Sequence, residues 1–301
     1  MGRLASPALR FVEVGPRDGL QNEKAELPLE LKVAFIDALS EAGLPEIEAG
    51  AFVSPKAVPQ MAGTAEVFKR IRRKKGVLYS ALVPNEQGLD AALEANAGKV
   101  AVFTAASETF NRKNINASIA ESLARFKPVV LRAAKAGLPV RAYVSTAFFC
   151  PYEGRIAPAQ VLPVVDALLG SGVNELSIGD TIGRAAPNDV RNLLEVLLER
   201  VDKQRVYLHF HDTYGMAVAN ALTAWQEYGI SGFDASAGGL GGCPYAPGAG
   251  GNVGTEDLAF AFEASGGKTG LDLKKLKAAS ALLAPGLGHP LPSHLSRVEL
   301  K

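Results

Sequence analysis

Helix-ending glycines that alternate with short apolar segments are the feature that most restricts the fold of this chain. Six times, a segment with helical periodicity ends at a glycine and passes within a few residues into an apolar run. A glycine in this place is typical of a helix C-cap, and the apolar run after it is typical of a buried strand. The glycines are Gly43, Gly76, Gly98, Gly137, Gly172 and Gly229.

Eight strands are predicted on this pattern. They cover residues 11–14, 46–49, 78–83, 100–103, 140–145, 175–178, 206–210 and 233–236. Helical segments lie between them, and in 29–42, for example, apolar residues recur at intervals of three and four. Eight successive βα units favour an α/β fold of the (β/α)8 TIM-barrel type, and a doubly wound sheet is the alternative.

The length of 301 residues fits one such barrel. We expect a single catalytic TIM-barrel domain over residues 1–301, with the barrel at about 9–266 and a C-terminal helical extension at about 270–301. Within the extension, residues 271–285 are predicted to form one helix that covers an end of the barrel.

The composition is that of a globular enzyme, with 48% hydrophobic residues, 21% charged residues and a net charge of +1. A charge so close to zero gives no reason to expect binding to nucleic acid or to an anionic membrane. Two cysteines do not make a disulfide framework, and no apolar run approaches the roughly 20 residues that span a bilayer. We therefore expect a cytoplasmic protein without a membrane partner.

His209 and His211 are the strongest functional signal, because the chain contains only four histidines. Alternate residues of a strand face the same side, so the two imidazoles can converge and form half of a divalent-metal site. The other interpretation is a pair of hydrogen-bonded histidines inside the barrel. In such barrels the chemistry takes place at the C-terminal ends of the strands, where polar residues follow several of the predicted strands.

Two further residues can complete the metal site. Asp18 follows the first strand and supplies an anionic oxygen; Asn252 supplies an amide oxygen, although an asparagine among glycines is also a common turn residue. With His209 and His211 they form a mixed set of ligands that suits Mg²⁺ or Mn²⁺ better than Zn²⁺ and leaves positions open for substrate. We expect no organic cofactor.

A glycine-rich segment follows the last predicted strand. Residues 236–254 hold eight glycines in 19 residues, which predicts a mobile lid, with a disordered tip as the alternative. At its centre, Cys243 lies between Gly242 and Pro244. The thiol of Cys243 could donate a proton to a developing carbanion or enolate when the lid closes.

Taken together, these motifs resemble the hydroxymethylglutaryl-CoA lyase (HMG-CoA lyase) family, part of a metal-dependent TIM-barrel superfamily that includes the isopropylmalate and homocitrate synthases. The resemblance covers nearly the whole chain. It rests on VEVGPRDGLQNE (12–23), FVSPK (52–56), KNIN (113–116), CPYEG (150–154), GDTIG (179–183), HFHDTYG (209–215) and GLGGCPYA (239–246). The arginine-aspartate and histidine pairs are shared across the superfamily, whereas the cysteine-containing loop marks the lyase branch.

The resemblance implies that 3-hydroxy-3-methylglutaryl-CoA is cleaved into acetyl-CoA and acetoacetate by a metal-assisted retro-Claisen reaction. His209 or Asp18 would take the proton of the substrate's hydroxyl group. Arg17 would stabilise the thioester enolate that departs, and Cys243 would protonate it.

The resemblance also implies roles for other polar residues that follow the strands. Glu48 would hold Arg17 in place, and Asp180 would belong to the same catalytic rim, although either acid could merely close a salt bridge. Gln21 and Thr181, together with Arg17, are expected to bind the substrate.

Five residues depart from the family pattern and leave the shape of the acyl pocket open. They are Ala51, Ala57, Phe148, Phe149 and Phe210. A roomier rim would admit a longer 3-hydroxyglutaryl-CoA homologue, such as the isohexenyl compound, so a lyase for that substrate is one alternative.

Two other classes of function stay open. A Claisen-condensing acyltransferase of the isopropylmalate synthase type is disfavoured by the lyase-type loop and by the lack of a sizeable C-terminal regulatory domain. A non-catalytic barrel is disfavoured because every expected ligand and acid is present. The expected partners are an acyl-CoA substrate and, through exposed barrel helices, a second copy of the chain in a homodimer.

Overall fold

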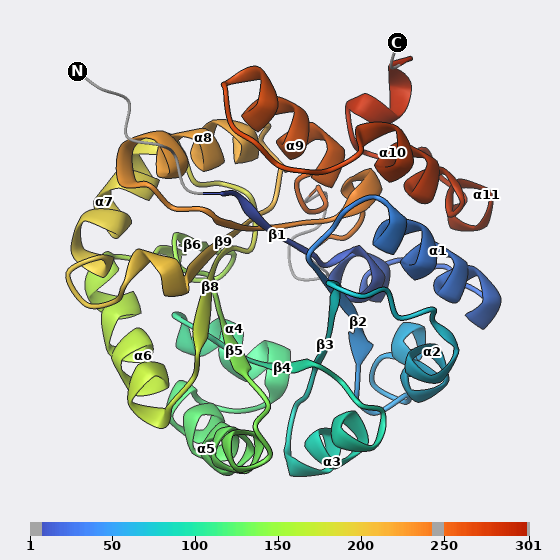
Figure 1. Cartoon of the computed structure of the whole chain (residues 1–301). Helices are drawn as coiled ribbons and strands as arrows, with labels where there is room; N and C mark the ends of the chain where they lie inside the picture. Colours follow the sequence, from blue (N-terminus) through green and yellow to red (C-terminus); the bar gives the residue numbers. More distant parts are fainter. Residues whose placement is uncertain (1–7, 243–249, 300–301) are drawn as a thin grey trace.

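Eight parallel strands close into a barrel in the computed structural model, which describes residues 8–242 and 250–299 (Figure 1). Around the barrel they follow the order β1-β10-β9-β8-β5-β4-β3-β2. Their bounds are β1 (Arg10–Glu13), β2 (Glu46–Ala51), β3 (Leu78–Leu82), β4 (Lys99–Ala105), β5 (Val140–Ser145), β8 (Glu175–Asp180), β9 (Val206–Phe210) and β10 (Gly232–Ala235). Each predicted strand is found to within two residues at either end.

The barrel closes where β1 pairs with β10, with Phe11 opposite Phe233 and Glu13 opposite Ala235. A doubly wound sheet would instead end in two unpaired edge strands. The pairing therefore confirms the (β/α)8 prediction and excludes the open-sheet alternative.

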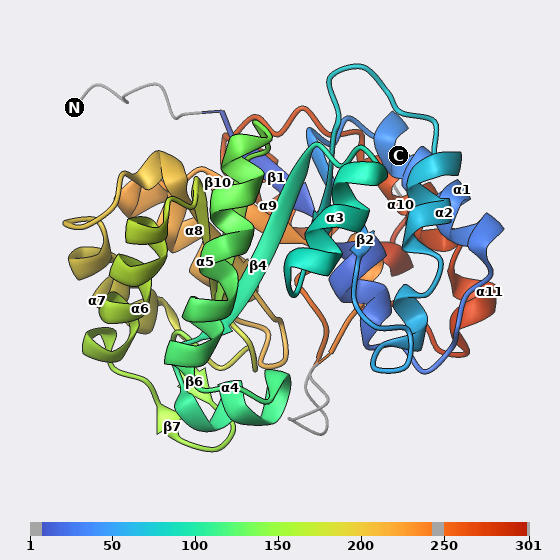
Figure 2. The same cartoon turned by 90° about the horizontal axis from the view of Figure 1, so that it is seen from below.

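Eleven α-helices are described, and most of them surround the strands as an outer ring, whereas α4 lies across one end of the barrel (Figures 1 and 2). They are α1 (Leu29–Glu41), α2 (Thr64–Arg70), α3 (Glu86–Glu94), α4 (Glu108–Ile115), α5 (Ile119–Lys135), α6 (Pro158–Ser171), α7 (Pro187–Leu197), α8 (Ala217–Tyr228), α9 (Thr255–Ala264), α10 (Leu273–Ala281) and α11 (Ala284–Leu287). Short turns are η1 (Gly15–Gly19), η2 (Pro59–Met61), η3 (Lys203–Arg205), η4 (Ala237–Gly239) and η5 (Leu295–Arg297). Within the described ranges, the helices are all too short or too polar to cross a lipid bilayer.

Strand side chains alternate between the inside of the barrel and the layer beneath the helices. On β9, His209 points into the barrel, whereas Leu208 joins the main hydrophobic core. That core lies between the strands and the helices. In it, the ring centroid of Phe262 on α9 lies 6.0 Å from that of Phe11 and 4.9 Å from that of Phe233. The inside of the barrel holds polar side chains such as Arg141 and Asp234, next to a small separate cluster of Val12, Val14 and Tyr207.

The prediction of one helix at 271–285 is wrong in two respects. The segment forms two helices, α10 and α11, and Pro285 lies in the first turn of the second, where its missing N–H breaks no helical hydrogen bond. In addition, α10 packs between α1 and α9 in the outer ring rather than over an end of the barrel (Figure 1). The chain then returns to the end of β10, where the N–H of Ser293 donates to the carbonyl of Gly238 at 3.0 Å.

A small antiparallel hairpin was not predicted from the sequence. It consists of β6 (Phe149–Cys150) and β7 (Gly154–Arg155) and lies beside α4 (Figure 2). The N–H of Thr109 at the start of α4 donates to the carboxylate of Glu153 at 2.7 Å, which joins the two elements.

Four of the six predicted helix caps are confirmed. The glycines with positive φ directly after a helix are Gly43, Gly137, Gly172 and Gly229. The other two predicted caps are wrong, because α2 ends at Arg70, well before Gly76, and the left-handed residue after α3 is Asn96 (φ 55°) rather than Gly98.

Candidate active site

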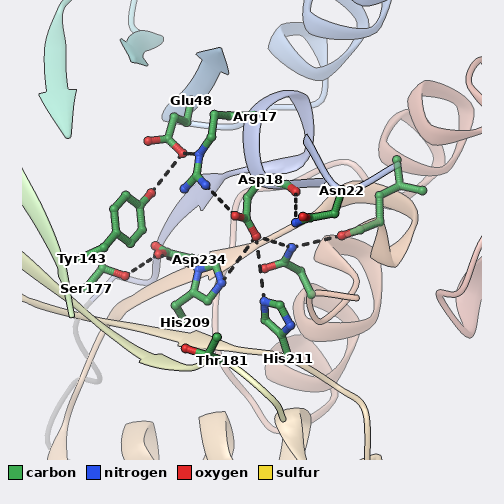
Figure 3. A network of polar contacts seen from close by, with 12 residues as sticks. Arg17, Asp18, Asn22, Glu48, Tyr143, Ser177, Thr181, His209, His211 and Asp234 are labelled. Carbon is green, nitrogen blue, oxygen red and sulfur yellow. Dashed lines mark hydrogen bonds and ion pairs between the residues drawn. The ribbon is translucent and has the colours of Figure 1, made fainter. Parts of the chain in front are cut away.

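Three residues that are distant in the sequence meet at the C-terminal end of the barrel strands (Figure 3). Oδ2 of Asp18 lies 3.7 Å from Nε2 of His209 and 3.9 Å from Nε2 of His211. One possible ligand atom from each residue lies within 4.8 Å of the other two. The spacing is that of three side chains that can hold one metal ion.

The protonation states of these groups suit a divalent ion. Burial, followed by repulsion from His209, lowers the pKa of His211 to about 4, so its imidazole is neutral at neutral pH. Burial opposes ionisation of Asp18, but the charges of Arg17 and the two histidines outweigh it and hold the pKa of Asp18 well below its usual range. A neutral imidazole and an ionised carboxylate are the forms that bind metal.

The turn η1 presents Arg17 and Asp18 side by side to the site. It is a π-helical turn, in which the N–H groups of residues 17, 18 and 19 lie 3.1, 2.7 and 3.1 Å from the carbonyl oxygen of Val14. Gly15 fits only because it has no side chain, since a Cβ would lie 2.6 Å from Oε1 of Glu13. Such turns are frequent at functional sites because they change the direction of successive side chains.

Asn252, the fourth predicted metal ligand, lies next to Asp18. Its side-chain nitrogen donates to Oδ2 of Asp18 at 2.9 Å and to the carbonyl of Leu240 at 3.1 Å. The structure thus brings Asn252 to the site but turns its amide nitrogen, not its oxygen, toward Asp18.

Arg17 is fixed by two carboxylates. Its Nε donates to Glu48 at 2.5 Å and its Nη1 to Oδ1 of Asp18 at 2.5 Å, and the hydroxyl of Tyr143 also donates to Glu48 at 3.1 Å (Figure 3). Burial disfavours the guanidinium ion, but Glu48 and Asp18 outweigh it and hold the pKa of Arg17 above its usual range. Nη2 of Arg17 makes no hydrogen bond to any residue of 8–242 or 250–299, so it is available to a ligand.

A cavity of about 200 Å³ adjoins this cluster. Gln21 and Thr181, both predicted to bind substrate, line it together with Arg17. The hydroxyl oxygen of Thr181 accepts a hydrogen bond from the N–H of Thr146 at 2.7 Å, which fixes its position. Gly242 also lines the cavity.

Cys243, the predicted acid, lies outside the described residues, in the gap 243–249. Its position therefore stays a prediction from the sequence.

The apolar lining of the cavity is not formed by the residues that depart from the family pattern. It consists of Val53, Val58, Leu82, Phe103, Phe110, Ile115 and Val144. In the described part of the chain, Phe148 and Phe210 instead pack against each other within the main core, with ring centroids 6.1 Å apart. The shape of the pocket, which the sequence left open, therefore depends on residues other than these phenylalanines.

Asp180 is the last residue of β8 and is buried. Its carboxylate accepts the N–H of Arg184 at 3.2 Å and the N–H of Ala185 at 2.8 Å, and burial raises its pKa to about 7. These contacts hold the turn after β8, which begins with Thr181. The carboxylate of Asp180 does not join the described cluster of metal-ligating side chains.

Sequence reasoning missed several polar side chains inside the barrel. They are Arg141, Tyr143, Ser177 and Asp234. The available signal was strand alternation, since each residue sits at an inward-facing position of a strand that was predicted correctly. Their partners could not be found in this way, because the contacts join residues 57 to 95 positions apart.

The chain matches known proteins over most of its length. A model of the HMGL-like family matches residues 8–283. The mitochondrial hydroxymethylglutaryl-CoA lyase of Bos taurus is 50% identical over 97% of this chain and 90% of that protein. Among solved structures, the HMG-CoA lyase of Bacillus subtilis has a TM-score of 0.93 at 49% identity, covering 95% of this chain and 96% of that one. An HMG-CoA lyase from Acinetobacter baumannii, solved in complex with coenzyme A and 3-methylmalate, has a TM-score of 0.93 at 39% identity, covering 100% and 99%. This chain therefore belongs to the HMGL-like family.

Proposed function

We propose that the chain cleaves 3-hydroxy-3-methylglutaryl-CoA into acetyl-CoA and acetoacetate, with residues 1–301 working as one catalytic unit. The observation that carries the proposal is the convergence of Arg17, Asp18, His209 and His211 on one cavity at the C-terminal end of the barrel. Relatives about 50% identical to the chain are named for this activity. A coenzyme A complex of one relative supports an acyl-CoA substrate.

Asp18, His209 and His211 would hold a divalent ion, with the amide oxygen of Asn252 as the fourth ligand. Oxygen and nitrogen ligands without thiolates favour Mg²⁺ or Mn²⁺. When bound, the ion supplies Lewis-acid polarisation of the substrate's hydroxyl and carboxylate oxygens.

Asp18 and His209 are the two candidates for accepting the hydroxyl proton, and Nε2 of His209 can accept it only while it does not bind the ion. The carboxylate of Asp18 has a strongly lowered proton affinity because Arg17 is paired with it. On His209, Nδ1 faces Asp234 at 3.2 Å, which leaves the lone pair on Nε2, toward the cavity. Loss of the proton lets the hydroxyl oxygen become the ketone of acetoacetate while the bond to the thioester fragment breaks.

The electrons of the broken bond pass to the thioester as an enolate, and Arg17 is placed to stabilise it. Arg17 lines the cavity, and a cation fixed by ion pairs on Nε and Nη1 needs no reorganisation as charge develops. Glu48 acts through Arg17 by holding it. Protonation of the enolate carbon by Cys243 then gives acetyl-CoA, and the cavity position of the neighbouring Gly242 supports this assignment.

A product assay tests the proposal. The chain loaded with Mg²⁺ or Mn²⁺ should release acetoacetate and acetyl-CoA in equal amounts from 3-hydroxy-3-methylglutaryl-CoA, and removal of the ion with EDTA should stop the release. Release of free thiol from acetyl-CoA and 2-oxoisovalerate, without cleavage, would point to the condensing acyltransferase instead.

Cys243→Ala is expected to lower kcat by about 10² to 10⁴, as for loss of a proton-transfer group, while Mn²⁺ still binds. Steady-state cleavage and Mn²⁺ titration measure the two effects. An unchanged kcat would remove Cys243 from the reaction.

We also propose that the chain forms a homodimer. Two large apolar side chains are exposed on neighbouring parts of the outer ring, Phe260 on α9 and Leu282 at the end of α10. Sedimentation equilibrium tests this, and Phe260→Glu should shift a dimer toward monomer.

A further inference from the structure

Asp234 lies inside the barrel, on the strand next to the histidine pair. The Cα of Asp234 on β10 is in register with the Cα of His209 on β9, and the side chain of Asp234 is fully buried. Oδ2 of Asp234 lies 3.2 Å from Nδ1 of His209 and accepts the hydroxyl of Ser177 at 2.6 Å (Figure 3). One oxygen of the Asp234 carboxylate therefore faces the imidazole of His209.

The other oxygen is held by Arg141. Nη2 of Arg141 donates a hydrogen bond to Oδ1 of Asp234 and forms an ion pair with it. Both side chains are buried. The guanidinium of Arg141 is itself fixed between rings, with its central carbon 4.4 Å from the ring centroid of Tyr207 and 5.2 Å from that of Tyr143. Asp234 therefore has one orientation available.

We propose that Asp234 is a positioning residue, held by Arg141 and Ser177, which fixes the ring and the tautomer of His209 so that Nε2 faces the ion site. The proposal concerns the ion site of the function proposed above and rests on that site. A carboxylate accepts hydrogen bonds and does not donate them, so the nitrogen that faces it must carry the proton. Nδ1 of His209 is then protonated, and its lone pair lies on Nε2, the nitrogen 3.7 Å from Asp18.

Substitution by asparagine should reverse this tautomer. Arg141 has only donors, so it will bind the amide oxygen of Asn at 234 in place of Oδ1. The amide nitrogen then occupies the place of Oδ2 and donates to Nδ1 of His209, which moves the imidazole proton to Nε2. A protonated Nε2 cannot bind an ion.

The test compares the wild-type chain with Asp234→Asn. In the ion-free wild type, nitrogen-15 NMR of the imidazoles should show His209 protonated at Nδ1; in Asp234→Asn it should show Nε2 protonated. Titration with Mn²⁺, followed by electron paramagnetic resonance, should give a Kd about 10- to 100-fold weaker for the variant. A matched control is Asp37→Asn, since Asp37 is a buried partner of Arg72 outside the barrel; it should lower Tm and leave the Mn²⁺ Kd unchanged.

Each outcome bears on the proposal. An Nε2-protonated His209 in the wild-type chain would overturn it, and that measurement needs no variant to fold. An Asp234→Asn protein with unchanged Mn²⁺ affinity would also overturn it and reduce Asp234 to a structural ion pair. Tautomer and affinity changes as expected would support the proposal even if the chain failed to cleave 3-hydroxy-3-methylglutaryl-CoA, so the two proposals fail separately.

Discussion

Arg17 contacts both acidic residues of the site, Glu48 and Asp18. Its Nε and Nη1 bind Glu48 and Asp18, so the side chain is immobile before a ligand arrives. Its cation also lowers the proton affinity of Asp18, which keeps that carboxylate in its ligating form. One residue thereby affects both the ion site and the place where enolate charge develops.

Arg17→Lys should therefore lower kcat by about 10² to 10³, because a lysine cannot reach two carboxylates and a substrate oxygen in the same plane. Steady-state cleavage of the thioester measures the change. Arg72→Lys provides the matched control, since Arg72 pairs with Asp37 at the surface, and it should leave kcat unchanged. An equal loss in both variants would mean that Arg17 acts through stability alone.

The predictability of the site also differs from residue to residue. The sequence indicated Asp18, His209 and His211 because each belongs to a short motif at the end of a predicted strand. Asp234 carries no such motif, and its importance depends on being in register with His209. Register between strands is set by packing of the whole barrel, so local patterns do not reveal it.

At the scale of elements, Glu13 joins the end of β1 to the segment that leads into the glycine-rich loop. Its carboxylate is fully buried; Oε1 accepts the N–H of Gly15 at 2.8 Å and of Ala237 in η4 at 2.9 Å, and Oε2 accepts the hydroxyl of Thr255 at 2.6 Å. Burial raises the pKa of Glu13 to about 7, although these hydrogen bonds oppose the shift. The contact between β1 and η4 therefore depends on a carboxyl group whose neutral form is favoured by burial.

Because its pKa is raised in the folded chain, Glu13 should make the free energy of unfolding fall as pH rises. Because the pKa of Glu13 rises from 4.5 to about 7 on folding, the folded chain binds more protons between those values. The stability that Glu13 provides is full below pH 4.5 and is lost as pH rises to about 7, by roughly 3 kcal/mol. In Glu13→Gln the amide oxygen can keep the two N–H contacts and the amide nitrogen can donate to the Thr255 hydroxyl, and the amide does not titrate. The free energy of unfolding of wild type minus variant should therefore fall over this range in urea titrations. A difference that stays constant with pH would contradict the assignment.

Elements with strong local patterns were the ones predicted correctly. The barrel strands are apolar runs of four to seven residues between helices, and their bounds follow from composition and spacing. The hairpin β6–β7 has two residues in each strand, too few for any period to show. The break between α10 and α11 depends on Pro285, which can begin a helix as easily as interrupt one, so only the structure decides.

For the molecule as a whole, the ion site connects the two ends of the barrel sequence. Asp18 follows β1, His209 lies on β9 and His211 directly follows it, and β9 is separated from β1 only by β10. Asn252 comes after β10 and donates to Asp18. An ion bound here therefore links residues more than 190 positions apart, at the place where the barrel closes.

Ion binding should accordingly stabilise the entire fold. At a free Mn²⁺ concentration 100 times Kd, the free energy of unfolding should rise by about 2.7 kcal/mol, because the unfolded chain cannot bring these ligands together. For a chain of this size the gain corresponds to an increase in Tm of roughly 5 °C. Asp18→Asn should abolish the increase, whereas Asp166→Asn, which alters an exposed carboxylate paired with Arg200 on the outer helices, should retain it. Calorimetry measures the Tm of both variants with and without Mn²⁺. An equal increase in Tm in both variants would place the ion outside the cluster of Asp18, His209 and His211.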